Sequence, residues 1–129
     1  MDFVVRPRLG FEPNADVFVD EERSQVVVSV EIAGADPESL RVTLENRHLL
    51  ITGRRVEAPR SRRGSWVQKE IAYGSFAKRV HLPVAVDVLG EALAGYDDGM
   101  LVIALPLSPT AYLPSTRTEL RMIVKRTFH

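Results

Sequence analysis

Apolar and polar residues alternate along most of this chain with a period of two, which is the period of a β-strand and not of a helix. From Gln25 to Ile32, every second residue is valine or isoleucine, and the segment Leu40 to Leu44 repeats the pattern. One face of each segment is therefore expected to be buried. The segments predicted as strands are Asp16 to Val19, Gln25 to Ile32, Leu40 to Leu44, His48 to Thr52 (closed by Gly53), Trp66 to Ile71, Ala77 to Leu82 and the tail Thr118 to Phe128.

The strongest turn signal is the pair Asp98-Gly99, which separates the β-prone segments 94–97 and 100–105. Both residues adopt positive φ at low cost, so the pair predicts a tight hairpin. Residues 100–105 are apolar without interruption, which is typical of a strand covered on both faces. Pro106 should end this strand, because proline cannot donate a ladder hydrogen bond.

Short strands separated by turns roughly every ten residues, with no convincing long helix, predict an antiparallel immunoglobulin-like β-sandwich. Residues 84–93 fit a helical face and short extended pieces alike, and Gly90 favours the extended pieces. We expect one sandwich domain over residues 16–107, a short N-terminal arm over 1–15 and a C-terminal extension with a docking strand over 108–129. The arm is expected either to fray or to dock on a partner.

Composition narrows the classes of function. The 129-residue chain has 17 basic and 17 acidic residues, so it lacks the basic excess typical of a nucleic-acid-binding domain. It has no cysteine, which excludes disulfides, cysteine-bound zinc and a thiol nucleophile. No apolar run approaches the roughly 18 residues of a membrane span, and no long apolar leader is seen. The sequence therefore predicts a cytoplasmic protein with no membrane partner.

Residues suited to catalysis or ligand binding do not cluster in the sequence. The histidines His48, His81 and His129 are not at metal-ligand spacing, so structural roles are favoured for them. No nucleophile elbow, phosphate-binding loop or dinucleotide fingerprint occurs. Asp97 and Asp98 adjoin at a turn and fit turn chemistry better than acid–base catalysis. We therefore expect a protein that is not an enzyme and has no cofactor or metal.

The most polar stretch of the chain is residues 54–65, which predict a long loop. Between Arg54 and Arg63 there are five arginines and one glutamate, with Pro59 among them. One interpretation is a phosphate or RNA patch. However, Trp66 is the only aromatic neighbour, so a solvated or subunit-contacting loop is favoured and no nucleic-acid partner is expected.

Four motifs follow one another in a recognisable order. Residues 94–101 read Ala-Gly-Tyr-Asp-Asp-Gly-Met-Leu. The other three are Ala33-Gly34 followed by Leu40-Arg41-Val42, the segment Leu49-Leu50-Ile51-Thr52-Gly53-Arg54-Arg55, and the block from Glu70 to Pro83 that contains Tyr73-Gly74-Ser75-Phe76. Together they resemble the small heat-shock protein (α-crystallin) family over about Asp16 to Leu107.

The resemblance implies an α-crystallin β-sandwich and an ATP-independent chaperone that holds partly unfolded client proteins. It also implies homodimers, able to assemble further, in which the loop of residues 54–65 reaches the partner's sheet. Lys78 stands where the family often has arginine, and lysine cannot form the bidentate fork with a carboxylate. An interfacial ion pair at Lys78 should therefore be weaker. The residues so implied for the dimer contact are Arg60, Arg62, Arg63, Glu70 and Lys78.

A second contact is predicted for the tail from the pattern of its residues, independently of the family resemblance. Its apolar residues alternate at the period that would insert them into an apolar groove at a sheet edge. The groove is expected to consist of Leu40, Val42, Leu44 and Leu93, and the tail anchor of Leu120, Met122 and Val124. Docking is expected to be reversible, on the same or a neighbouring subunit. The alternative is that residues 40–44 are only core.

Two other classes of protein could have such a sandwich. A non-catalytic co-chaperone or adaptor would act as a protein-binding module, but it would usually lack the alternating tail and the long loop. An enzyme or carbohydrate-binding sandwich would need convergent polar residues or an aromatic platform. The nine aromatic residues of this chain are scattered and form no such cluster.

Overall fold

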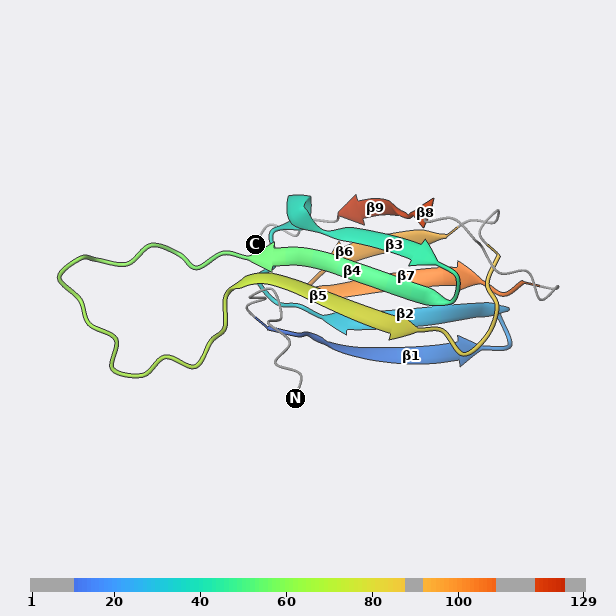
Figure 1. The fold of residues 1–129 in the computed structure, drawn as a ribbon, viewed down its shortest axis with the longest axis horizontal. Helices are drawn as coiled ribbons and strands as arrows, with labels where there is room; N and C mark the ends of the chain where they lie inside the picture. The colour runs from blue at the N-terminus through green and yellow to red at the C-terminus, as the bar shows by residue number, and fades with distance from the viewer. Residues whose placement is uncertain (1–10, 88–91, 109–117, 125–129) are drawn as a thin grey trace, which may run out of the picture.

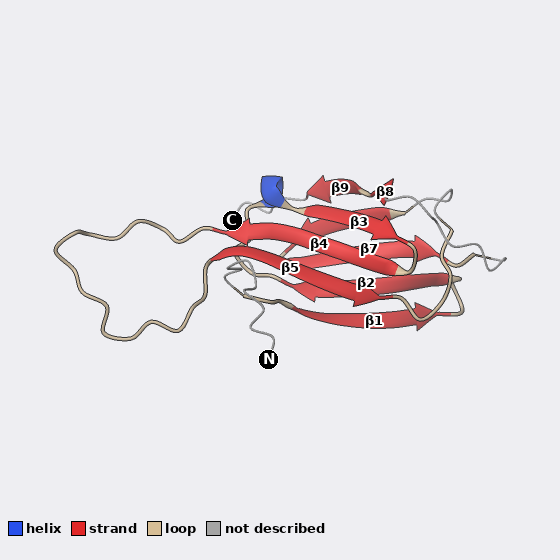
Figure 2. Ribbon diagram, in the orientation of Figure 1, coloured by secondary structure: helices blue, strands red, loops and turns tan. Residues whose placement is uncertain are grey.

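Two β-sheets packed face to face form the protein in a computed structural model, which describes residues 11–87, 92–108 and 118–124 (Figure 1). One sheet has the strand order β1-β2-β7-β6-β9 and the other β5-β4-β3-β8. The strands are β1 (Asn14–Asp20), β2 (Gln25–Glu31), β3 (Arg41–Glu45), β4 (His48–Arg55), β5 (Gly74–His81), β6 (Leu93–Asp97), β7 (Met100–Pro106), β8 (Thr118–Glu119) and β9 (Arg121–Val124). Within the described ranges the only helical element is the 3₁₀ turn η1 (Pro37–Ser39) (Figure 2).

The predicted β-sandwich is confirmed. Every pair of neighbouring strands is antiparallel except β6 and β9, which run parallel. The predicted hairpin at Asp98-Gly99 joins β6 to β7, and both residues have positive φ, 53° and 76°. Alternating residues of β2 are buried in the core, as the sequence pattern predicts. No polar or charged residue of the described segments is buried.

Strand β4 does not end at Gly53 as expected but continues to Arg55. The glycine serves close packing there, because a Cβ atom at this position would lie 2.6 Å from Cζ of Phe76 and 2.9 Å from Cδ2 of Leu40. Phe76 on β5 is 1% exposed, so its ring fills the space that a side chain at Gly53 would occupy. A glycine inside a strand is thus a site of close approach here, and not a stop.

The expectation that both faces of β7 are covered is wrong. Burial alternates along Met100–Pro106, and Val102 is 41% exposed. Leu101 and Ile103 point into the core between the two sheets, whereas Val102 is on the outer side. A two-layer sandwich has no third layer to cover that side. Packing in the core therefore does not account for the apolar residues on the outer face.

The strand expected from Trp66 to Ile71 is absent. Residues 56–73 have no regular secondary structure and connect β4 to β5 as one long loop. The loop projects from one end of the sandwich, well away from both sheets (Figure 1). An extended segment needs a neighbouring strand to satisfy its backbone, and within the described residues no strand lies beside this one.

Candidate protein-binding surfaces

The loop of residues 56–73 is the most conspicuous feature outside the sandwich. A loop longer than about 12–15 residues without secondary structure is uncommon in a compact domain and is usually functional. Residues 58–71 are all exposed, and Val67 is 99% exposed. Val56, Trp66 and Ile71 are also exposed large apolar residues. Exposed apolar surface on a projecting segment is a candidate contact with another protein.

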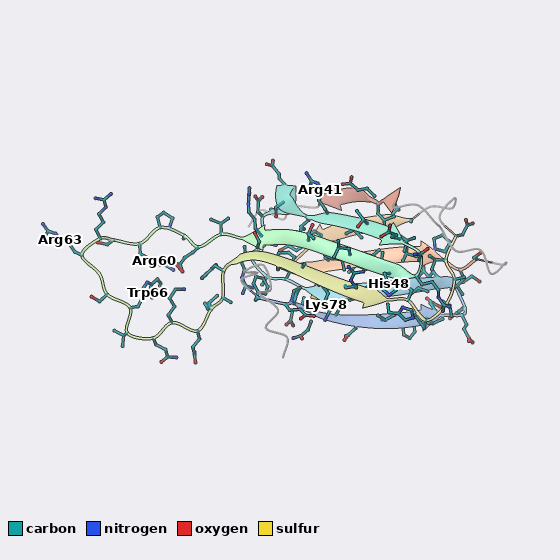
Figure 3. All side chains as sticks on the ribbon, in the orientation of Figure 1. Arg41, His48, Arg60, Arg63, Trp66 and Lys78 are labelled. Carbon is teal, nitrogen blue, oxygen red and sulfur yellow. The ribbon has the colours of Figure 1, made fainter. Side chains whose placement is uncertain are left out.

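Contacts across the loop give it a shape. Arg60 and Trp66 lie within the loop (Figure 3), with the guanidinium 5.8 Å from the centre of the indole. The Nζ atom of Lys69 lies 4.8 Å from the ring centres of Trp66 and of Tyr73, and 2.6 Å from Glu57 Oε1. Exposed cation–π pairs contribute only about 0.5–1 kcal/mol each. These contacts therefore bias the loop toward one shape without locking it.

Arg55 fastens the base of the loop to the sandwich. Its Nε and Nη2 atoms both donate to the carbonyl of Ala72, at 2.9 and 2.5 Å, and Nη1 donates to the carbonyl of Ala33 at 3.2 Å. The guanidinium also lies 4.0 Å from the ring centre of Phe11 and 5.7 Å from that of Tyr73. One side chain thus connects the two ends of the loop, the β2–β3 link and the segment before β1.

The residues expected at a dimer contact fall in two places. Those on the exposed loop are Arg60, Arg62, Arg63 and Glu70. Arg63 lies at the end of the loop farthest from the sandwich (Figure 3). Lys78 lies on β5 instead, and its Nζ atom is 3.1 Å from Oε1 of Glu12 in the same chain. Four of the five thus lie on the same loop, and Lys78 is apart from them.

The tail segment lies along the side of the sandwich where β3 and β6 would otherwise be edge strands. β8 pairs with β3, and the Leu120 amide donates to the carbonyl of Val42 at 2.8 Å. β9 then pairs with β6 in parallel register. Leu120 is 8% exposed and belongs to the core cluster. In this structure the tail therefore occupies the sandwich of its own chain.

The residues expected to line the groove do not all share one face. Those buried in the core are Leu40, Val42 and Leu44. Leu93 is 43% exposed, whereas its neighbour Ala94 is fully buried. The backbone of Met122 pairs with Ala94, and that of Val124 with Tyr96. The structure thus brings the tail alongside the row of residues 40–44 and leaves Leu93 on the outer side of β6.

The outer face of the five-stranded sheet carries an apolar row that the sequence analysis missed. Phe18, Val27, Ala104 and Leu93 are directly opposite one another across β1, β2, β7 and β6. Phe18 is 63% exposed, and Val102 projects from the same face. The consecutive valines of β2 concealed this row, because a run of apolar residues does not reveal which face is outward. We call these four residues together with Val102 the outer apolar row.

The described residues include neither a metal-binding cluster nor a membrane-spanning helix. No group of three or more histidine, cysteine or acidic residues there is placed to hold a metal ion. The same residues include no helix long and apolar enough to cross a membrane. His48 and His81, far apart in sequence, lie side by side on β4 and β5.

Comparison with known proteins links this geometry to one family. The sequence profile of the Hsp20/alpha crystallin family matches residues 18–118. Small heat shock protein C4 of Rickettsia felis is 28% identical over 94 residues, which are 73% of this chain and 56% of the relative. Small heat shock protein C2 of the same organism is 26% identical over 95 residues. The chain spans less than three fifths of the length of these curated relatives.

Solved structures show the same fold. The crystal structure of hspA from Xanthomonas axonopodis superposes with a TM-score of 0.67 at 28% identity, covering 78% of this chain and 98% of that one. A small heat-shock protein from Xylella fastidiosa gives 0.64 at 29% identity, covering 80% and 92%. Heat shock protein 16.0 from Schizosaccharomyces pombe gives 0.66 at 26% identity, covering 89% and 99%.

Proposed function

Because this chain belongs to the Hsp20/alpha crystallin family, we propose that it is a molecular chaperone that binds partly unfolded proteins without ATP and keeps them from aggregating. Its partners in this proposal are unfolding client proteins and other copies of the chain. The proposed activity needs no catalytic step and no cofactor, and its proposed location is the cytoplasm.

The observation that carries the proposal is the outer apolar row. Phe18, Leu93 and Val102 are 63%, 43% and 41% exposed on one face of the sandwich. An unfolding protein exposes apolar segments of its own, and burial of apolar surface is favourable by roughly 25 cal/mol per Å². β1 is also an edge strand, whose unpaired backbone groups can receive an extended segment. The row and the edge together suit a client of any sequence.

Self-association through the loop of residues 56–73 is the second part of the proposal. Val67 and Trp66 expose apolar surface far from the core, and Arg60 and Glu70 offer charges of both signs. A partner's sheet edge, such as β1 or β5, supplies the backbone groups that an extended loop lacks in a single chain. We therefore propose a homodimer as the unit of assembly.

Reversible docking of the tail is the third part. Burying the Leu120 side chain contributes about 1.5–3 kcal/mol. Ordering each tail residue costs about 1–2 kcal/mol, so the net attachment of the tail is weak. Release of the tail would add the edges of β3 and β6 to the surface available to clients or to a neighbouring subunit.

An aggregation assay tests the proposal. A test enzyme that precipitates on heating is followed by light scattering with and without the chain, in buffer that contains no nucleotide. The chain is expected to delay scattering, and the double variant Phe18→Ser with Val102→Ser is expected to protect less. Leu50→Ser makes the same kind of change on the outer side of the four-stranded sheet, away from both the row and the loop, and serves as the control.

The same samples distinguish the chaperone from an adaptor. Native mass measurement should give dimers or larger assemblies for the wild-type chain. A monomer that leaves the heated enzyme to precipitate at its normal rate would contradict the proposed function and favour a co-chaperone-like binding module. Equal protection by the wild-type chain and the double variant would exclude the outer apolar row as the client surface.

A further inference from the structure

Two histidines face each other on the outer side of the four-stranded sheet. His48 on β4 and His81 on β5 are directly opposite in the antiparallel register. Nδ1 of His81 lies 3.3 Å from Nε2 of His48, and the ring centres are 4.9 Å apart. The pair lies at the far end of β4 from the long loop (Figure 3), so it is separate from the proposed dimer contact.

We propose that His48 and His81 bind one divalent transition-metal ion of the zinc and copper class. Neutral imidazole is a favoured ligand of these ions, with Zn–N bonds of about 2.0–2.1 Å. Two nitrogens 3.3 Å apart, each at that bond length, subtend roughly 107° at the metal, which is close to the tetrahedral angle. In the metal-free pair the two nitrogens are therefore already at a separation compatible with two of the four zinc ligands.

Metal binding breaks the hydrogen bond within the pair. In the metal-free pair the two nitrogens are within hydrogen-bond distance, so one of them donates to the other. Metal binding needs a lone pair on both facing nitrogens, so the donor ring must carry its proton on its other ring nitrogen instead. The rings must also turn so that both lone pairs converge on the ion. His81 is exposed and His48 is partly exposed, which leaves room for that turn and for water at the remaining coordination positions.

Neighbouring charges set the strength of the site. Glu45 is directly opposite His48 on β3, so glutamate, histidine and histidine form one row across three strands. Glu45 and Arg79 also line the same shallow depression as His48. The carboxylate favours a cation there, whereas the guanidinium opposes it. Two imidazoles with these neighbours suit a reversibly bound ion better than a permanently held structural metal.

Calorimetric titration of the full chain with zinc chloride tests the site. One Zn²⁺ should bind per chain, and His48→Gln or His81→Gln should each weaken binding by at least about tenfold. Both side chains are on the outer surface, so circular dichroism should show that the variants fold. Arg79→Gln should tighten binding, because it removes the opposing charge.

His129→Gln is the matched control, since it removes the third histidine of the chain and leaves the pair intact. Its affinity for Zn²⁺ should equal that of the wild-type chain. Imidazole ¹⁵N chemical shifts of His48 and His81 should move together as zinc is added. The proposal is overturned if the wild-type chain binds no Zn²⁺, or if the double histidine variant binds it equally well. Either result would leave the chaperone proposal untouched, because neither histidine belongs to the outer apolar row.

Discussion

The hydroxyl of Tyr96 donates a 2.6 Å hydrogen bond to the backbone carbonyl of Ile32, 64 residues earlier in the chain. The same hydroxyl accepts a 3.2 Å hydrogen bond from the amide of Ala35. Ile32 and Ala35 belong to the link through which the chain passes from one sheet to the other. A single side chain on β6 thus holds the crossing between the two layers.

Replacing Tyr96 by phenylalanine should lower the free energy of unfolding by about 1–3 kcal/mol, because two backbone groups lose a partner in a buried place. Urea unfolding followed by circular dichroism measures the difference. Tyr73→Phe is the control, and as a change on the loop it should fall within about 0.5 kcal/mol of the wild-type chain. Equal stability of the Tyr96 variant and the wild-type chain would show that water replaces the hydroxyl at no cost.

The stability should also depend on alkaline pH through Tyr96. Burial raises the pKa of its hydroxyl, and the Ala35 hydrogen bond and the Arg55 charge oppose this only in part. In the unfolded chain, tyrosine ionises near pH 10, at about its ordinary pKa. The stabilisation is therefore complete below that pH and is lost as pH rises toward the higher folded pKa. Unfolding in urea across this range should show a smaller loss for Tyr96→Phe than for the wild-type chain.

Gly53→Ala should destabilise the sandwich by about 1–3 kcal/mol through overpacking. The added Cβ atom would lie 2.6 Å from Phe76 Cζ, and the buried ring must shift to make room. Gly64→Ala is the control, because its Cβ atom would have only one neighbour, the Ser61 carbonyl oxygen at 3.5 Å. Thermal unfolding of both variants should therefore separate them clearly. A neutral Gly53→Ala would mean that β4 and β5 adjust freely.

Arg55→Lys should loosen the base of the loop. Lysine keeps the charge but cannot donate to Ala72 and Ala33 together as the guanidinium does. Limited trypsin digestion should cleave the loop faster in this variant, at Arg60, Arg62 or Arg63. Arg54→Lys is the control, since Arg54 pairs with Asp36 at the surface and its replacement should leave the rate unchanged. Equal rates in all three proteins would contradict the anchoring role.

Met122→Glu should shift the distribution of oligomer sizes if the tail docks as proposed. The charge would disfavour any apolar seat for the tail, on its own or on a neighbouring chain. Native mass measurement gives the size, and Met122→Leu is the control that keeps an apolar side chain. An unchanged distribution would argue against docking. Val42→Glu is expected to unfold the sandwich instead, because Val42 is fully buried.

The alternation of apolar residues predicted the sandwich because one face of each strand is buried, and the Asp98-Gly99 pair predicted its hairpin from local backbone preference alone. The pattern did not predict which side of a strand faces outward where apolar residues are consecutive. The consecutive valines of β2 did not show that Val27 faces outward, and the apolar run of β7 did not show that Val102 does. The segment Trp66 to Ile71 has strand-forming residues, but no strand of the described segments lies beside it, and local sequence does not specify pairing. The histidine pair depends on the β4–β5 register, which spacing along the chain does not reveal.

The seven residues 118–124 belong to both layers, since β8 completes one sheet and β9 the other. β8 pairs through two residues and β9 through four, so each end is too short to hold the segment well alone. Release of the segment should therefore expose the edges of β3 and β6 in one cooperative step, so that local opening has two states, closed and fully open. Exposure of the two edges would then rise sharply above a threshold of temperature or of misfolded protein. Two independent segments, one on each edge, would give a gradual rise instead.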